Sequence, residues 1–175
     1  TLIDSSCSYD IIYDTVSINP LPTLSLDSLV NITCNGLDNG AIAVTPEGFG
    51  PFSVIWSTTS TDTVITQLPP NDYSIQVTDS NNCTDTFQYT ILEPPILEAE
   101  SFVLSDYNGA DISCFEGNDG AVFVNYQGGV GGYSVTWSPG FQSTDTLFNQ
   151  EAGTYIVTVL DSNACEIEDT IALVD

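Results

Sequence analysis

The feature that most constrains the fold is an internal repeat with an interval of about 80 residues. Corresponding cysteines are offset by 80 residues at the start of each copy and by 82 at its end, as expected for a duplication with small loop insertions. The matched stretches are CNGLDNGAIAV (34–44) with CFEGNDGAVFV (114–124), FSVIWS (52–57) with YSVTWS (133–138), and DYSIQVTDSNNC (72–83) with TYIVTVLDSNAC (154–165). We therefore predict two repeats, 21–95 and 96–175. Residues 1–20 match only the end of a copy, so we interpret them as the last strands of a truncated preceding repeat.

The repeated stretches have the two-residue alternation of half-buried β-strands. In the second copy, Tyr133, Val135 and Trp137 fall on one face and are predicted to point inward. Glycine, proline, asparagine and aspartate gather between the strands, where turns need them. Six or seven short strands in about 80 residues predict an all-β fold, a tandem array of small immunoglobulin-like β-sandwiches.

The cysteines recur with nearly constant spacing. Cys34 and Cys83 are 49 residues apart, and Cys114 and Cys165 are 51 residues apart. This spacing predicts one disulfide in each repeat, Cys34 with Cys83 and Cys114 with Cys165, while Cys7 would pair with a partner upstream. Disulfides of this kind place the protein in an oxidising, extracellular compartment. A zinc site is a poor alternative, because the chain has no CxxC motif and no histidine.

The charge is entirely negative. The chain has 24 aspartates and glutamates and no lysine, arginine or histidine. Nucleic-acid binding and docking on anionic lipid both need cationic side chains and are excluded. Histidine acid–base catalysis and lysine Schiff-base chemistry are excluded for the same reason, and we predict that the chain is not an enzyme. No apolar run has the roughly 18 residues of a membrane span, so no direct membrane insertion is expected.

The pattern of these motifs resembles the SprB-repeat family. The resemblance rests on C-x5-G-x-hydrophobic, a strand ending in tryptophan, TYxVxVxDSNxC, and a final strand that ends in proline. Such repeats occur in tandem in giant cell-surface adhesins of gliding Bacteroidota, which the type IX system secretes. The resemblance implies a stalk that carries load in surface attachment and gliding, at the outer membrane of a Gram-negative cell. Its partners would be neighbouring repeats of the same chain, other filament subunits or surface glycans.

The resemblance also implies O-glycosylation, because proteins of this phylum carry O-glycans where an Asp-Ser or Asp-Thr pair precedes an apolar residue or threonine. Two of the sites, Thr63 and Thr146, recur at the same repeat position. The full set of candidate acceptors is Thr15, Ser28, Thr63, Thr146 and Thr170.

Two other binding sites are weaker predictions. Asp38 and Asp119 lie in equivalent glycine-rich turns and supply the oxygen ligands that Ca²⁺ prefers, as do Asp79 and Asp161 in the DSNxC turns. No known calcium-loop spacing is present, so we favour solvated turn aspartates and no cofactor. Four aromatic residues near predicted loops suggest an alternative function as a glycan- or ligand-binding module, although we favour their packing onto the sandwich: Phe49, Tyr126, Phe141 and Phe148.

Overall fold

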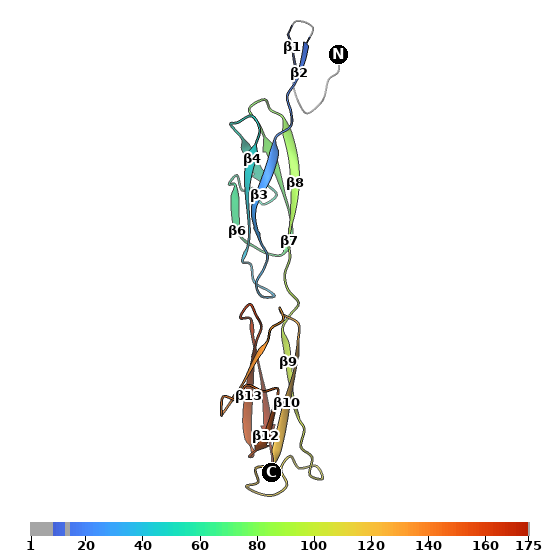
Figure 1. Cartoon of the computed structure of the whole chain (residues 1–175), viewed down its shortest axis with the longest axis vertical. Coiled ribbons are helices and arrows are strands. Elements are labelled where there is room, and N and C mark those ends of the chain that lie inside the picture. Colours follow the sequence, from blue (N-terminus) through green and yellow to red (C-terminus); the bar gives the residue numbers. More distant parts are fainter. Residues whose placement is uncertain (1–8, 13–14, 175) are drawn as a thin grey trace. The chain divides into compact units, whose positions relative to one another are not determined.

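A computed structural model describes residues 9–12 and 15–174, and all of its regular elements are antiparallel β-strands (Figure 1). The all-β prediction is confirmed. No helix with the length and apolar character needed to cross a bilayer occurs within these described ranges.

The chain divides into two compact units. Unit 1 contains the chain up to Ile32 together with Gly36–Glu93, and unit 2 contains Thr33–Asn35 together with the chain from Pro94 onward. The three-residue segment Thr33–Asn35 is therefore flanked on both sides by residues of unit 1 but belongs to unit 2. Repeat boundaries were predicted at 95/96, and the last change of unit lies at Glu93/Pro94.

Unit 1 contains two three-stranded sheets and a two-stranded hairpin. One has the order β3 (Thr23–Val30), β4 (Gly40–Glu47) and β6 (Val64–Leu68). The other has the order β5 (Ser53–Trp56), β7 (Asn71–Thr78) and β8 (Thr84–Ile91). The hairpin of β1 (Tyr9–Ile12) and β2 (Thr15–Ile18) precedes them. Assignment of residues 1–20 to a preceding repeat stays a prediction.

Unit 2 repeats this strand order, which the tandem duplication predicts. One sheet contains β12 (Thr146–Gln150), β10 (Gly120–Gln127) and β9 (Glu98–Val103). The other contains β11 (Ser134–Ser138), β13 (Gly153–Leu160) and β14 (Glu166–Leu173).

Each unit has its own core between its two sheets, as in an immunoglobulin-like sandwich. Trp56 and Trp137 are the largest buried side chains, and each indole N–H donates to a loop carbonyl, Asp62 O at 2.8 Å and Thr144 O at 2.9 Å. The buried residues of unit 1 are Ile32, Ile42, Val44, Val54, Trp56, Ile65, Leu68, Tyr73, Ile75, Val77 and Ile91. Those of unit 2 are Ile112, Val122, Val124, Val135, Trp137, Leu147, Tyr155, Val157, Val159 and Leu173.

One predicted core residue lies outside the core. Tyr133 precedes β11 and is 36% exposed. Its ring packs edge-on against Tyr126, with 4.9 Å between the ring centroids. The two-residue alternation predicted the inward positions Val135 and Trp137 correctly, but Tyr133 belongs to the loop before the strand.

Candidate functional site: a disulfide joint

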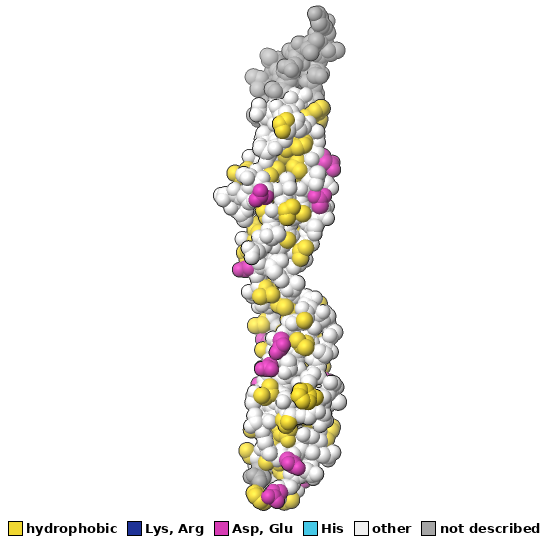
Figure 2. All heavy atoms as spheres, turned by 90° about the vertical axis from the view of Figure 1, so that its left-hand side faces the viewer, with side chains coloured by type: hydrophobic (Ala, Val, Ile, Leu, Met, Phe, Trp, Pro, Cys, Tyr) yellow, Lys and Arg dark blue, Asp and Glu magenta, His cyan; other side chains and the backbone are white. Residues whose placement is uncertain are grey.

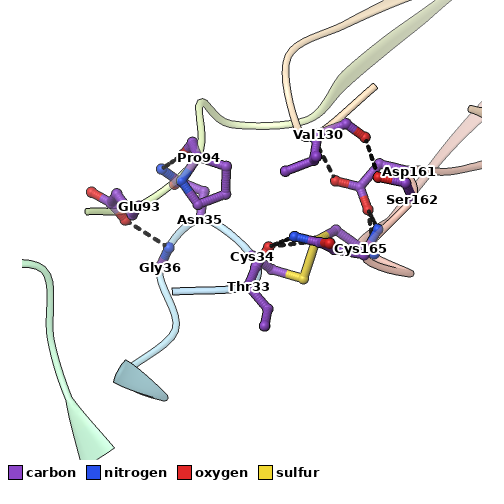
Figure 3. The surroundings of a disulfide bond; sticks show 11 residues. Thr33, Cys34, Asn35, Gly36, Glu93, Pro94, Val130, Asp161, Ser162 and Cys165 are labelled. Atoms are coloured by element: carbon purple, nitrogen blue, oxygen red, sulfur yellow. Dashed lines mark hydrogen bonds between the residues drawn. A yellow bond between two sulfur atoms is a disulfide. The ribbon is translucent and has the colours of Figure 1, made fainter. Parts of the chain in front are cut away.

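The structure contains a disulfide between Cys34 and Cys165, whose Cα atoms are 5.6 Å apart (Figure 3). This distance lies within the range that a disulfide spans. The predicted pairings of Cys34 with Cys83 and of Cys114 with Cys165 are therefore wrong.

The strand order explains why Cys34 does not pair with Cys83. The loop that carries Cys34 is anchored at the end of β8, because Leu92 N donates to Asn31 Oδ1 at 2.9 Å and Gly36 N donates to Glu93 Oε2 at 3.1 Å. Cys83 immediately precedes the first residue of β8. A strand of 8 residues is roughly 27 Å long, whereas disulfide-bonded Cα atoms lie within about 7 Å of each other.

The same geometry separates Cys114 from Cys165. Val174 N donates to Asp111 Oδ2 at 2.8 Å, so the loop leading to Cys114 is anchored beyond the end of β14. Cys165 immediately precedes the first residue of β14, so the two cysteines belong to opposite ends of a strand of 8 residues. The near-constant spacing of the cysteines reflects the repeat and does not identify the partners.

The DSNxC turn holds Cys165 through the carboxylate of Asp161. Asp161 Oδ1 accepts hydrogen bonds from Asn163 N at 2.8 Å and Cys165 N at 2.9 Å, and Oδ2 accepts one from Val130 N at 2.8 Å. Burial raises the pKa of this carboxyl, but these backbone donors outweigh burial and leave the pKa below its usual value. The turn is thus fixed internally, with the cysteine at its end.

Two further contacts seat Thr33–Asn35 within unit 2. Asn163 Nδ2 donates to Thr33 O at 2.8 Å, and Asn35 Nδ2 donates to Pro94 O at 3.0 Å (Figure 3). The Sγ atom of Cys165 also lies 3.3 Å from Thr33 O. Asn163 of the DSNxC motif therefore binds the segment that carries Cys34, and the motif is a joint rather than a simple turn.

The equivalent aspartate of unit 1 makes the same bonds within its turn. Asp79 Oδ1 accepts from Asn81 N at 2.8 Å and from Cys83 N at 2.9 Å. Asp79 and Asp161 are only 5% and 6% exposed, so the interpretation of both as solvated turn aspartates is wrong. They hold the turns through hydrogen bonds with backbone N–H groups.

The remaining cysteines differ in their surroundings. Cys83 is buried, whereas Cys114 is exposed and is not part of a disulfide in the described structure. Cys7 lies outside the described residues, so its predicted upstream partner stays a prediction.

The other calcium candidates lie in turns. Asp38 is exposed, and Asp119 accepts a hydrogen bond from Ser113 N at 3.1 Å. Hydrogen bonds from Ser113 hold the pKa of Asp119 below its usual value. Within residues 9–12 and 15–174, no three histidine, cysteine, aspartate or glutamate side chains gather as a metal site. Calcium binding at Asp38 and Asp119 stays a prediction.

The candidate O-glycan acceptors are unequally accessible. Ser28, Thr63 and Thr170 are exposed, and Thr146 is half-buried. The Thr15 side chain lies outside what the structure describes. Modification of all five stays a prediction.

Three of the loop aromatics do not pack onto the sandwich as favoured. Phe49 and Phe148 are exposed, and Phe141 is 81% exposed with a positive φ of 49°. Tyr126 is half-buried, and its hydroxyl donates to Asp145 Oδ1 at 3.0 Å. The favoured packing interpretation is wrong for the three phenylalanines.

Sequence reasoning missed several residues of the joint. Thr33 and Val130 act through backbone atoms, for which side-chain identity gives no signal. Asn163 lies in the recognised motif, but its contact with Thr33, 130 residues earlier in the chain, has no local signature. If disulfides between the first cysteine of one repeat and the second cysteine of the next had also been considered, the Cys34–Cys165 pair would have been among the candidates.

Comparison with known proteins identifies part of unit 2. Residues 107–141, which contain Cys114 and Trp137, match the family model described as SprB repeat. This segment is a SprB repeat. The match agrees with the resemblance that the repeated motifs suggest, and it identifies a surface-protein repeat module within unit 2.

Several solved structures are similar to this chain at low sequence identity. A C-terminal intimin fragment in complex with the intimin-binding domain of its translocated receptor is 16% identical, with a TM-score of 0.43 over 85% of this chain and 64% of the fragment. DIP-gamma IG1+IG2 is 15% identical, with a TM-score of 0.41 over 90% of this chain and 98% of that chain. Domains 1–6 of the surface layer protein SbsC are 14% identical, with a TM-score of 0.37 over 87% of this chain and 27% of that chain. No curated protein matches.

Proposed function

We propose that this chain is a structural segment of a giant cell-surface adhesin, a stalk that carries mechanical load in surface attachment and gliding. The SprB repeat at residues 107–141 supports a surface protein. The family further suggests export by the type IX secretion system and a location at the outer membrane of a Gram-negative cell. Labelling of intact cells with an antibody against the repeat tests the location, with permeabilised cells as the control.

The Cys34–Cys165 bond is the observation that carries the proposal. Its cysteines are separated by 131 positions in the sequence. Tension applied to the two ends of the chain passes through the sulfur atoms, and residues 35–164 lie outside the path of the force. A covalent bypass of this kind limits how far the segment extends if its sandwiches unfold.

The bond shortens the maximum extension of the chain by a large amount. The residues that still carry the tension, 1–34 and 165–175, number 45 of the 175. The oxidised chain therefore extends to about 150 Å, against about 600 Å for the same chain without the bond. A stalk that transmits force over a distance benefits from such a limit.

Single-molecule pulling on the full chain tests this function. Handles attached beyond both ends are pulled with and without a reducing agent, and reduction is expected to add about 450 Å of contour length. The C34S/C165S double variant should show the longer value under both conditions, while the C114S variant should behave as the unmodified chain. Equal contour lengths for oxidised and reduced protein would contradict a bypass that limits extension.

The uniform charge suits an exposed stalk. Acidic side chains are scattered over the face in view, and the sequence has no basic side chain to pair with them (Figure 2). Like charges on neighbouring repeats repel and oppose self-association. We extend the proposal to its partners, which are neighbouring repeats of the same chain and other subunits of a surface filament.

The exposed phenylalanines favour a second candidate function, binding of a glycan or another ligand. Phe141 is the most exposed of the three, at 81%. Aromatic rings presented to solvent are common in sugar-binding surfaces, since they supply apolar contact area. Glycan-array binding by the full chain, lost in F141A and retained in F148A, would support a site at Phe141. Absence of binding to any glycan would leave the stalk as the better explanation.

A further inference from the structure

The loop around Cys114 repeats the one around Cys34. Asn31 accepts a hydrogen bond from Leu92 N at 2.9 Å, and its counterpart Asp111 accepts one from Val174 N at 2.8 Å. The next residues, Ile32 and Ile112, are both buried in the cores of their units, at 4% and 2% exposure. Both loops therefore begin from the same anchored position and then present a cysteine two residues later.

The two loops differ in what their cysteines meet. Cys34 is bonded to Cys165, and the carbonyl of Thr33 accepts a hydrogen bond from Asn163. Cys114 is exposed and lies outside any disulfide of the described residues, and its neighbour Phe115 is 79% exposed. The same loop therefore carries a disulfide-bonded cysteine at position 34 and an exposed cysteine at position 114.

The residues that hold Cys34 come from the DSNxC turn at 161–165, which lies with Thr33–Asn35 in unit 2. Asp161 fixes the turn, Asn163 binds the backbone before Cys34, and Cys165 supplies the sulfur. These three residues are part of the repeated motif, so every further copy of the module would present the same set.

We propose that Cys114 forms a disulfide with the DSNxC cysteine of a further copy of this module, placed after it in the same chain, as Cys34 does with Cys165. Two thiols each lose a proton and together lose two electrons as the S–S bond forms. A disulfide oxidant accepts them by thiol–disulfide exchange and is reduced to two thiols. This proposal concerns the covalent partner of Cys114 and does not depend on the stalk carrying load.

The consequence is a chain of overlapping loops. Position 114 lies inside the segment that Cys34 and Cys165 enclose, so a bond from Cys114 to a later copy would start within one loop and end beyond it. Successive sandwiches would then be covalently interlocked, and reduction of one bond would leave its neighbours in place.

An extended chain tests the proposal. The full chain of 175 residues is followed directly by a second copy of residues 94–175, then oxidised in a glutathione redox buffer so that mispaired bonds exchange. Native alkylation and peptide mapping without reduction identify each pair. The Cys34–Cys165 peptide serves as an internal reference for correct folding of the original part.

The expected result is a peptide that links Cys114 to Cys165 of the appended copy, with neither thiol alkylated. In the C114S variant, Cys165 of the appended copy should become alkylated. A C114S/S143C variant moves the exposed thiol to another loop of the same unit. In this variant the introduced thiol at position 143 and Cys165 of the appended copy should both be alkylated, because only the Cys114 loop has the anchored geometry.

Two outcomes would overturn the proposal. One is a bond between Cys114 and Cys165 both within the appended copy. The other is alkylation of Cys114 in the original part while the reference Cys34–Cys165 peptide is present. If the appended copy does not fold, native alkylation of the original chain still tests the premise, since protection of Cys114 in the folded 175-residue protein would contradict an exposed loop awaiting a partner.

Discussion

The DSNxC turns of the two units share a sequence pattern, yet their aspartates are held differently. In both turns, one oxygen of the aspartate carboxylate accepts hydrogen bonds from two backbone N–H groups of the turn. In unit 2 the other oxygen accepts Val130 N, whereas in unit 1 Asp79 Oδ2 is buried and has no hydrogen-bond partner in the described structure. A repeated motif therefore fixes the turn but not its whole environment.

The cause lies in the loop that faces the turn. Ser80 N donates to Phe49 O and Ser162 N donates to Val130 O, both at 3.1 Å, so the loops meet the turns at equivalent points. In unit 2 Gly128 and Gly129 adopt positive φ angles of 80° and 56°, and this backbone directs Val130 N toward the carboxylate. The comparison shows that a neighbouring loop, outside the motif, decides whether a buried carboxylate is fully hydrogen-bonded.

The largest difference between the units should come from the disulfide. The C34S/C165S double variant is expected to lose about 4–5 kcal/mol in the free energy of unfolding of unit 2, because the bond closes a long loop in the unfolded chain. Each unit contains one tryptophan. In urea unfolding followed by fluorescence, the W56F background therefore reports unit 2 through Trp137, and the W137F background reports unit 1 through Trp56. C114S is the matched control and should be neutral. An equal loss in both units would contradict a bond that stabilises unit 2.

Gly129 should be the next most sensitive position. A Cβ added there would lie 2.7 Å from Asp161 Oδ2, and the φ of 56° is unfavourable for alanine. G129A is expected to destabilise unit 2 by about 2–4 kcal/mol through backbone strain and loss of the Val130 hydrogen bond. Gly131 is the control, because a Cβ there meets nothing within 4 Å, and G131A should be neutral or slightly stabilising. Equal effects of G129A and G131A on the stability of unit 2 would contradict a specific role of Gly129 in directing Val130 N toward Asp161.

Replacing the aspartates themselves compares the two turns directly. D161N should destabilise unit 2 by about 1–3 kcal/mol, because an amide cannot accept from all three backbone N–H groups that the carboxylate serves. D79N should cost less in unit 1, since its amide nitrogen can occupy the site of the unpartnered oxygen. Urea unfolding with the single-tryptophan reporters measures both. A larger loss for D79N would show that Asp79 Oδ2 has a partner in solution.

Some of this arrangement was predictable from the sequence, and some was not. Two-residue alternation identified the strands and the inward Trp56 and Trp137, because burial on one face of a sheet imposes that period. The partner of Cys34 was not predictable from spacing, since a periodic chain gives the same intervals for a bond within a repeat and for one to the next repeat. The distinction needs the strand order, which places the two cysteines of one repeat at opposite ends of a strand.

The exposed phenylalanines illustrate a second limit. Hydrophobicity predicts burial only on average, and Phe141 has a positive φ in a loop whose path the local sequence does not determine. The carboxylate–backbone contacts of Asp161 show the same limit for polar groups. Its partner Val130 contributes only an N–H, which every residue other than proline possesses.

The smallest predicted effect concerns the fourth residue of the DSNxC turn. Asn82 and Ala164 occupy equivalent positions, and both have a φ of 61°. Asparagine tolerates this left-handed conformation better than alanine, so A164N should stabilise unit 2 by about 0.5–1 kcal/mol. The reciprocal N82A should destabilise unit 1 by a similar amount.

The measurement is the midpoint of urea unfolding with the single-tryptophan reporter of the unit concerned, in oxidised protein so that the Cys34–Cys165 bond is constant. A164G serves as a second test, because glycine removes the Cβ that makes this conformation unfavourable. If A164N and A164G both leave the midpoint unchanged, the left-handed backbone of this turn costs alanine nothing, and the difference between the two turns lies wholly in the loop that faces them.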